Sequence, residues 1–394
     1  MYLISARRIS LAVAISCLIL SVGIAAHAQT YKLLYQFKPG ADGSQPYSSL
    51  ILDKQGNMYG TTSTDGAYAS GTVYRVTPSG KETVLYSFTG LGGDGANPYT
   101  PLTGDSAGNL YGTTTYGGNY GGICGSTGCG TVFKLAPTGK ETVLHRFTGV
   151  NGDGYSPYQG VIRDAAGNLY GTTALGGSGL GIVFKISPTG KETIVHDFNF
   201  SNGDGYFPAG GSLIRDSAGD LYGVTEVGGS GGAGTVYKID KTGNETILAS
   251  FDFGSAGYEP YGSLLLDAEG NLYGTTLFGG TFNEGTAFKV DTSGNETALY
   301  NFSGMDGDGV IPNGGLVQDS AGNLYGTTGG GGKDFFGTVF KIDPSGTETI
   351  LRSFSSTDGR TPESGLVRDS QGNLYGTTQY GGTYGGGVLF KLTP

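Results

Sequence analysis

The stretch SAGNLYGTT at residues 106–114 returns without a change at residues 320–328. Related stretches occur seven times, and their tyrosines are Tyr59, Tyr111, Tyr170, Tyr222, Tyr273, Tyr325 and Tyr375. Successive tyrosines are 50 to 52 residues apart, except for one interval of 59 residues that contains two cysteines. A period of about this length is typical of solenoids and propellers, in which each unit packs against its neighbours.

Each unit contains four short segments with the composition of β-strands. In the second unit they span residues 101–105, 109–114, 130–135 and 141–147, rich in Val, Leu, Thr, Tyr and Phe. Gly108 is placed to supply the positive φ of the first turn, and Pro137 and Gly139 suit the turn before the fourth segment. No segment after residue 28 carries an apolar period of 3.6 residues. We therefore expect an all-β fold.

The two ends of the chain contain complementary parts of one repeat unit. Residues 31–37 match a fourth strand that has no unit of its own, and residues 387–392 match a third strand with no fourth strand after it. Pairing these ends would close a ring and remove the free sheet edges. We therefore predict, over residues 29–394, a seven-bladed β-propeller of four-stranded antiparallel blades, closed by the N-terminal strand. Tyr31 should face Lys391, and the Leu and Tyr of GNLYGTT should fill the layers on opposite faces of the blade.

Six units carry a basic residue on the third strand seven positions before a glutamate on the fourth. A four-residue hairpin loop would place each pair directly opposite on a solvated face, where it contributes about 0.2–1 kcal/mol and sets register. The pairs are Arg75–Glu82, Lys134–Glu141, Lys185–Glu192, Lys238–Glu245, Lys289–Glu296 and Lys341–Glu348.

The first 28 residues have the three parts of a secretory signal peptide. Arg7 and Arg8 precede an apolar stretch at residues 11–26, and a small-residue cleavage site ends at Ala28. Cys17 also allows a lipoprotein, although little apolar sequence precedes it. We expect removal of residues 1–28 and a secreted product, extracellular or periplasmic.

The chain after residue 28 is acidic, because loss of Arg7 and Arg8 takes the formal net charge from −10 to −12. This charge argues against nucleic acid and against anionic membranes as partners, and we expect a soluble monomer.

Cys124 and Cys129 should form a local disulfide in an oxidising compartment. Zinc would need two further soft ligands, and none is visible nearby in the sequence.

The unit P…GLV.D..GNLYGTT..GG….GTVFK, followed by P.G.ET.L..F, resembles the Gloeo/Verruco ("GloVer") tandem repeat of exported bacterial proteins. The resemblance covers all seven units and implies a propeller and export, but no activity. D..GNLYG also resembles, more weakly, the propeller repeat of two-component regulators, which typically has Trp where this chain has Tyr. Many GloVer proteins end in a surface anchor, whereas this sequence stops at Pro394. The resemblance therefore favours free release over tethering.

Two features recur in the loops that leave the second and fourth strands, on the face where propellers usually bind ligands. The first is Asp-Gly before a proline, at Asp42, Asp94, Asp153, Asp204, Asp308 and Asp358. A ring of such carboxylates could bind cations or sugar hydroxyls. The bland alternative is turn chemistry repeated with the unit.

The second feature is a set of aromatic residues beside paired glycines in loops that vary between blades. Aromatic rings on such loops suit sugar stacking or peptide anchoring, against the alternative that they fold back onto the blades. The set comprises Tyr68, Tyr116, Tyr120, Phe278, Phe282, Phe335, Phe336, Tyr380 and Tyr384.

Evidence for catalysis is thin. The two histidines after residue 28, His145 and His196, stand where Tyr86 or Tyr300 stand in other units, and we interpret them as surface residues. No nucleophile triad, histidine metal site, phosphate loop or cofactor motif can be proposed. Three functions stay open: a secreted module that binds polysaccharide or protein through its loop face, a structural surface protein without a small ligand, and a propeller lyase or glycosidase that uses two of the aspartates.

Overall fold

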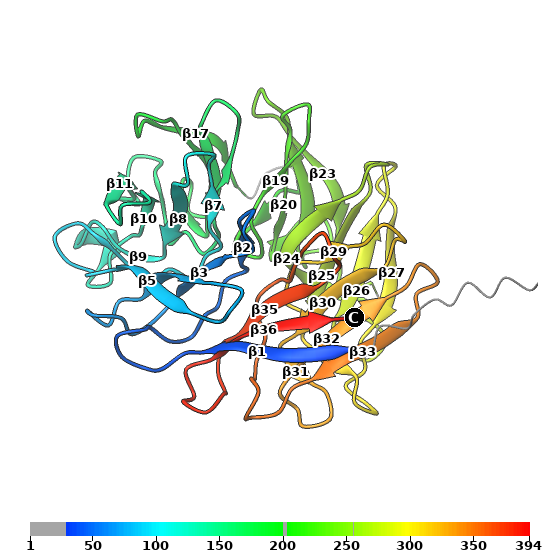
Figure 1. Ribbon diagram of the computed structural model, residues 1–394. Helices are drawn as coiled ribbons and strands as arrows, with labels where there is room; N and C mark the ends of the chain where they lie inside the picture. The colour runs from blue at the N-terminus through cyan, green and yellow to red at the C-terminus, as the bar shows by residue number, and fades with distance from the viewer. Residues whose placement is uncertain (1–28, 200–202, 255) are drawn as a thin grey trace, which may run out of the picture.

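The computed structural model describes residues 29–199, 203–254 and 256–394, and the predicted signal peptide lies outside these residues. Seven four-stranded antiparallel sheets form a ring (Figure 1). The prediction of an all-β, seven-bladed propeller is confirmed. Over the ranges described, no helix is long and apolar enough to cross a membrane.

The chain passes through each blade from the central channel outward. Leu52, Val317 and Val367 of the innermost strands line one hollow on the channel axis. We number the blades 1 to 7 by these innermost strands, β2 (Ile51–Leu52), β7 (Thr103–Gly104), β13 (Ile162–Arg163), β19 (Ile214–Arg215), β24 (Tyr258–Leu266), β29 (Val317–Gln318) and β34 (Val367–Arg368).

The middle of each blade is formed by two five- to seven-residue strands that are largely buried. The second strands are β3 (Met58–Thr62), β8 (Leu110–Thr114), β14 (Leu169–Thr173), β20 (Leu221–Thr225), β25 (Leu272–Phe278), β30 (Leu324–Thr328) and β35 (Leu374–Thr378). The third strands are β4 (Thr72–Val76), β10 (Thr131–Leu135), β16 (Ile182–Ile186), β22 (Thr235–Ile239), β26 (Thr286–Val290), β32 (Thr338–Ile342) and β36 (Val388–Thr393).

The outermost strands lie at the rim of the ring. They are β5 (Glu82–Ser87), β11 (Glu141–Arg146), β17 (Glu192–Asp197), β23 (Glu245–Ser250), β27 (Glu296–Asn301), β33 (Glu348–Ser353) and, for blade 7, β1 (Thr30–Gln36).

Short ribbons join the two loops of four blades on the face where the second strands end. They pair β6 (Gly95–Ala96) with β9 (Tyr116–Gly117), β12 (Gly154–Tyr155) with β15 (Leu175–Gly176), β18 (Gly205–Tyr206) with β21 (Val227–Gly228), and β28 (Gly309–Val310) with β31 (Gly330–Gly331). In blade 5 the same pairing continues into the longer strands β24 and β25.

The repeated GNLYGTT stretch is the second strand, and its residues have separate roles. Leu110 packs in a cluster with residues of blade 1, and Tyr111 packs in a cluster with residues of blade 3, as predicted. Gly112 leaves room for the third strand, because a Cβ atom there would lie 2.8 Å from the buried Phe133 ring. The turn before the strand is closed by Asp105, which accepts hydrogen bonds from the Asn109 N–H and, at 2.9 Å, the Tyr111 hydroxyl. Gly108 has φ +80°, as expected.

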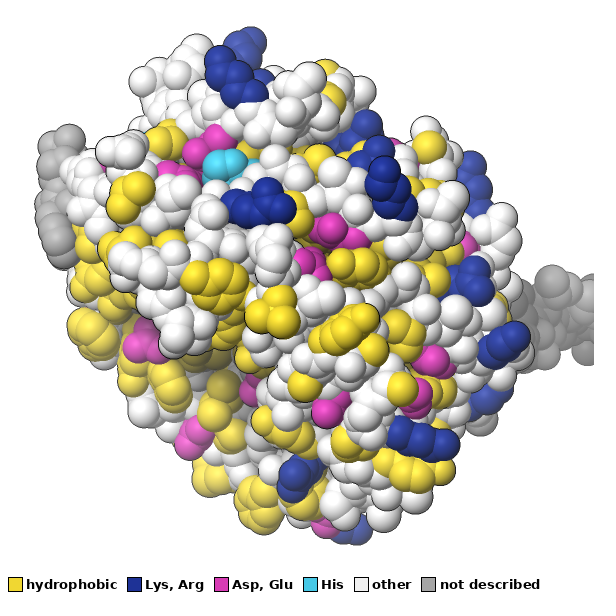
Figure 2. Space-filling view, turned by 90° about the vertical axis from the view of Figure 1, so that its left-hand side faces the viewer, with side chains coloured by type: hydrophobic (Ala, Val, Ile, Leu, Met, Phe, Trp, Pro, Cys, Tyr) yellow, Lys and Arg dark blue, Asp and Glu magenta, His cyan; other side chains and the backbone are white. Residues whose placement is uncertain are grey.

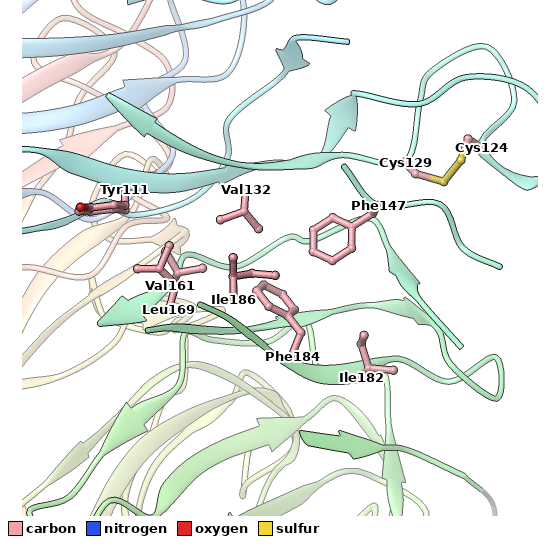
Figure 3. Packing of buried hydrophobic residues seen from close by; sticks show 10 residues of the cluster. All are labelled: Tyr111, Cys124, Cys129, Val132, Phe147, Val161, Leu169, Ile182, Phe184 and Ile186. Atoms are coloured by element: carbon pink, nitrogen blue, oxygen red, sulfur yellow. A yellow bond between two sulfur atoms is a disulfide. The ribbon is translucent and has the colours of Figure 1, made fainter. Parts of the chain in front are cut away.

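Neighbouring blades are joined by one aromatic contact that recurs seven times. The phenylalanine that follows each outermost strand packs edge-on or tilted against an aromatic ring on the third strand of the next blade, at centroid distances of 4.8 to 5.3 Å. All seven phenylalanines are fully buried: Phe37, Phe88, Phe147, Phe198, Phe251, Phe302 and Phe354. Figure 3 shows this layer between blades 2 and 3, where Phe147 meets Phe184.

The ring is closed by the strand that begins the described chain. β1 pairs antiparallel with β36, and Figure 1 shows the blue strand beside the red one. Leu33 lies opposite Phe390, and Tyr31 stacks on the Phe390 ring at a centroid distance of 5.7 Å. The predicted closure is confirmed, but its register is displaced by one residue, because Lys391 faces Lys32 and Tyr31 faces Leu392.

The predicted pairing of basic residues with glutamates is wrong. Thr77 bonds to Lys81 across a three-residue loop, so Arg75 lies opposite Thr83 and Glu82 lies opposite Val76. The other five pairs are displaced in the same way. The basic side chains instead cover the repeat tyrosines of the second strand, as Lys134 does 5.8 Å from the centroid of the Tyr111 ring.

The insertion in blade 2 contains a short 3-10 helix, η1 (Gly122–Cys124), and the predicted disulfide between Cys124 and Cys129. Both half-cystines are buried at the outer end of the layer drawn in Figure 3. The disulfide therefore closes a short loop within the insertion, and packing of its two half-cystines on the core cluster holds that loop against the propeller.

Candidate functional site at the channel mouth

A second hollow lies on the channel axis, at the start of the innermost strands. It encloses about 40 Å³, and all seven blades contribute to its wall. The larger lining residues are Tyr47, Tyr99, Tyr158, Gln159, Tyr261, Asn313 and Glu363. Most of the remaining lining residues are glycine or serine, such as Gly211 and Ser263. We call this hollow the channel mouth.

The backbone that delivers these residues is the same in every blade. A proline precedes the mouth residue, and the residue before that proline has a positive φ of 53° to 64°. Such a conformation is unfavourable for a β-branched residue such as Ile311 or Thr361 and persists only where the surroundings impose it. Here the preceding blade imposes it: the N–H of the residue with positive φ donates a hydrogen bond to that blade, as the Ile311 N–H does to the Glu284 carbonyl. The mouth residues are therefore held by contacts between blades.

Four tyrosines occupy the position after that proline, in blades 1, 2, 3 and 5. Tyr47 and Tyr99 meet edge to face with ring centroids 5.6 Å apart. Burial, together with the neighbouring Tyr261 and Glu363, raises the pKa of Tyr47. Burial and the nearby Glu226 raise the pKa of Tyr261 to about 12. These hydroxyls stay protonated at neutral pH and can donate as well as accept hydrogen bonds.

Polar groups complete the wall where tyrosine is missing. Blade 6 supplies Asn313, which is buried and whose Oδ1 atom has no hydrogen-bond partner. Blade 7 supplies Glu363, whose pKa is raised by burial. Blade 4 has an alanine at this position, and Glu226 from its next loop lies near Tyr261 instead. Burial raises the pKa of Glu226 to about 7, with a smaller contribution from the nearby Glu259. The mouth thus combines aromatic faces with amide and carboxyl groups.

The structure divides the predicted aromatic set. Tyr116 and Tyr380 lie close enough to Tyr99 to influence its pKa, and Tyr116 also reaches Tyr158. The others lie away from the mouth wall. Phe336 packs on the core beside the seam, Phe278 stacks on Tyr258, Tyr120 bonds to the Gly90 carbonyl, Tyr384 lies under Lys38, and Tyr68, Phe282 and Phe335 are exposed loop residues.

The six predicted aspartates do not line the mouth. Each carboxylate points to the turn that contains it or to the outermost strand nearby. Asp94, for example, accepts hydrogen bonds from Thr89 N–H at 2.8 Å and from the Tyr86 hydroxyl at 3.1 Å. Equivalent contacts hold Asp42 through Tyr35, Asp153 through Thr148, Asp204 through Asn199, Asp308 through Ser303, and Asp358 through Ser355.

The two histidines are not ordinary surface residues. Their side chains are only 17% (His145) and 15% (His196) exposed, and each lies between two carboxylates at a blade interface. The sequence interpretation missed this because the glutamate in question belongs to the next repeat.

The mouth residues were not among the residues predicted from the loops, although the sequence contains a signal for them. The proline is constant in all seven units, whereas the residue after it reads Tyr, Tyr, Tyr, Ala, Tyr, Asn and Glu.

Comparisons with known proteins agree with this fold. The family model of the Gloeobacter/Verrucomicrobia repeat matches residues 22–217 and 208–394. Curated protein sequences gave no match. Among solved structures, the extracellular domain assigned to a hybrid two-component system of B. thetaiotaomicron aligns with TM-score 0.53 and 16% identity, over 91% of this chain and 42% of that one.

Two further solved structures are similar in the same way. A protein of Bacteroides uniformis assigned as a 6-phosphogluconolactonase aligns with TM-score 0.51 and 14% identity, over 81% of this chain and 88% of that one. A gluconolactonase from Xanthomonas campestris aligns with TM-score 0.46 and 16% identity, over 92% and 89% of the two chains. At these identities the likeness concerns the fold alone.

Proposed function

This chain belongs to the Gloeobacter/Verrucomicrobia repeat family, and we propose that it is an exported carbohydrate-binding propeller that holds a neutral glycan at the channel mouth. The observation that carries the proposal is the convergence of four tyrosines from four blades on one hollow. Export is supported by the sequence of residues 1–28 and by the resemblance to exported repeat proteins.

The chemistry of the wall suits sugars. Tyrosine rings offer flat apolar faces for the C–H surfaces of a sugar, and their hydroxyls bond to its oxygens. The unpartnered Asn313 Oδ1 and the carboxyl of Glu363 supply acceptors for hydroxyl donors. The enclosed space of about 40 Å³ is far smaller than a small-ligand cavity, which is about 300–1,000 Å³, so the sugar would lie across the mouth on the tyrosine rings and not inside it. A protein partner would instead need a contact surface of about 800 Å² on each side.

Charge favours neutral glycans over acidic ones. Glu226, Glu259 and Glu363 lie at or beside the mouth, and no lysine or arginine is among the described residues that line its wall. An anionic sugar would be repelled by these carboxylates in a partly desolvated hollow.

The test is a glycan array on the purified protein, followed by calorimetry with the glycans that bind. Tyr99→Ala and Tyr158→Ala should weaken binding at least ten-fold, which corresponds to about 1.4 kcal/mol. Phe335→Ala is the matched control, because this ring is 76% exposed and lies on a loop outside the mouth. Its affinity and its melting temperature should equal those of the unchanged protein.

Two outcomes would contradict the proposal. One is an array without any bound neutral glycan, which would favour a structural surface protein. The other is binding that survives both mouth substitutions. New reducing ends or unsaturated products in the same samples would indicate cleavage of the glycan and would assign an enzyme to the mouth.

A further inference from the structure

We propose that two interfaces between neighbouring blades each bind one zinc-class divalent cation through a histidine, an aspartate and a glutamate. The first site comprises His145, Asp153 and Glu192, between blades 2 and 3. The second comprises His196, Asp204 and Glu245, between blades 3 and 4. The proposal is independent of the glycan site, because none of these residues lines the channel mouth.

The geometry of the two sites is nearly the same. His145 Nε2 lies 3.5 Å from Asp153 Oδ1 and 3.8 Å from Glu192 Oε1. The corresponding distances from His196 Nε2 are 3.6 Å to Asp204 Oδ2 and 3.7 Å to Glu245 Oε2. In each site the three atoms lie within 4.8 Å of one another. Ligand atoms about 2.0–2.2 Å from a tetrahedral zinc are separated by about 3.3–3.6 Å, so the groups stand close to ligating distance.

The local chain fold explains how one strand serves two interfaces. Each outermost strand contains a β-bulge, and in β11 it falls between Val143 and His145. The extra residue reverses the face to which the following side chains point. Glu141 therefore turns toward the preceding interface, where it lies near Asp94, whereas His145 turns toward the next one. The imidazole is held by edge-on packing against Phe147 at a centroid distance of 4.8 Å.

The second observation is that buried atoms of both sites lack hydrogen-bond partners. In the first site these are the facing atoms themselves, His145 Nε2, Asp153 Oδ1 and Glu192 Oε1. In the second site His196 Nε2 has no hydrogen bond, and each carboxylate keeps one unpartnered oxygen, Asp204 Oδ1 and Glu245 Oε1, beside the oxygen that faces the imidazole. The Asp204 side chain is only 5% exposed. A buried polar group without a partner is unfavourable, and a bound cation would interact with all three groups together.

Interfaces with tyrosine in place of histidine provide an internal comparison. There the tyrosine hydroxyl donates to the aspartate, at 3.1 Å for both Tyr86–Asp94 and Tyr300–Asp308. The second oxygen of Asp94 accepts the Gly95 N–H at 2.7 Å. Asp153 and Asp204 each keep one oxygen without a hydrogen bond, and in Asp153 this oxygen is the one that faces the imidazole. Replacement of tyrosine by histidine therefore coincides with an aspartate whose oxygen is available as a ligand.

One imidazole nitrogen with two carboxylate oxygens is a ligand set for zinc, manganese, nickel or cobalt rather than for calcium, which prefers oxygen alone. Three protein ligands leave at least one position for water. Figure 2 shows a histidine at the surface beside acidic side chains, so solvent can reach such a site. A bound cation would tie the outermost strands of adjacent blades together.

The test is calorimetric titration of the tag-free protein with Zn²⁺ alone at pH 7.5. The expected stoichiometry is two zinc ions per chain. His145→Tyr and His196→Tyr should each reduce it to one, and the double variant should bind none. Tyrosine is the natural residue at the equivalent position in other blades, so these variants should keep their fold, which the melting temperature without metal checks.

The repeat also offers a gain-of-site variant. Tyr86→His places an imidazole opposite Asp94 and Glu141 and should raise the stoichiometry to three. Co²⁺ in place of Zn²⁺ should give visible d–d absorption in the unchanged protein and none in the double variant. Tyr99→Ala, which tests the glycan site, should leave the two zinc ions in place.

Three results would overturn the proposal. The first is an unchanged protein that binds less than one zinc ion per chain at micromolar zinc. The second is a double variant that retains its zinc. The third is a histidine NMR titration with both pKa values above 8 and no response to metal, which would identify ion triads of a protonated imidazole with two carboxylates.

Discussion

A glutamate begins the outermost strand of six blades, and its side chain turns inward to a blade interface. The Oε1 atoms of Glu82, Glu141, Glu296 and Glu348 are buried there without a partner. Burial raises the pKa of each of these carboxyls to about 7, with a smaller contribution from a neighbouring aspartate. These groups oppose folding when they are charged.

The first prediction concerns Glu296, whose interface has no histidine. Because its pKa is higher in the folded chain than the ordinary 4.5, the folded state holds the proton longer. The stability due to that proton is complete below pH 4.5 and is lost as the pH rises through about 7. Glu296→Gln should therefore be about as stable as the parent at pH 4.5 and more stable by about 1 kcal/mol at pH 8.

Urea unfolding at the two pH values measures this difference. Glu269→Gln, on the exposed turn of the same blade, is the control and should change stability equally at both values. A Glu296→Gln protein with no gain at pH 8 would show that the carboxylate finds a partner when it is charged.

A second prediction distinguishes two tyrosines on one loop of blade 7. Tyr380 lies near Tyr99 at the channel mouth, whereas Tyr384 lies under Lys38 at 4.7 Å from its Nζ. Tyr380→Ala should weaken glycan binding several-fold, and Tyr384→Ala should leave it unchanged in the same calorimetric assay. Equal effects of the two substitutions would place the ligand on the outer loops instead.

At the scale of the element, the second strand of each blade is limited by a glycine. A Cβ atom at Gly112 would lie 2.8 Å from Phe133 and 3.0 Å from Leu102, and both side chains are buried. Gly112→Ala should therefore destabilise the protein by about 1–3 kcal/mol through overpacking.

Gly104, in the innermost strand β7 of the same blade, is the matched control. A Cβ atom there meets nothing nearer than 3.7 Å. Gly104→Ala should change the melting temperature little, and calorimetric scans of both variants check the difference. Equal melting temperatures would mean that the Phe133 ring has room to move.

The existence of the elements could be predicted from the sequence, but their register could not. The seven tyrosines, the turn glycine Gly108 and the phase of the chain ends were enough to predict blades and closure. The predicted pairing of Arg75 with Glu82 was wrong because strand register depends on the turn and on the bulge. Neither the turn nor the bulge has a distinct spacing in the sequence. For the same reason His145 could not be assigned to an interface with Glu192, a residue of the next repeat.

At the scale of the whole molecule, the candidate site depends on closure of the ring. Tyr47, Tyr99 and Tyr261 are far apart in the chain and meet only because seven blades share one axis. No motif within a single unit indicates that these tyrosines lie together. The mouth therefore became visible in the structure, although the loops that surround it had been predicted to face a ligand.

The last prediction concerns the seam between β1 and β36. A chain that begins after β1 would leave β36 as an exposed edge and would remove the Tyr31 ring from Phe390. Such an edge pairs with other chains. We expect the shortened protein to melt at a lower temperature and to elute as larger species in gel filtration than the chain from residue 29. Unchanged melting and elution would show that three strands suffice for blade 7.

The seam also sets the order of events during synthesis. β1 is the first strand of the propeller to leave the ribosome, yet its partner β36 is among the last, more than 350 residues later. β1 therefore has no partner strand until β36 has been synthesised, because contacts so distant in sequence form late. A chain that ends before β36 would leave β1 without its partner strand and the ring open, and we expect proteases to cleave it faster than the chain that reaches residue 394.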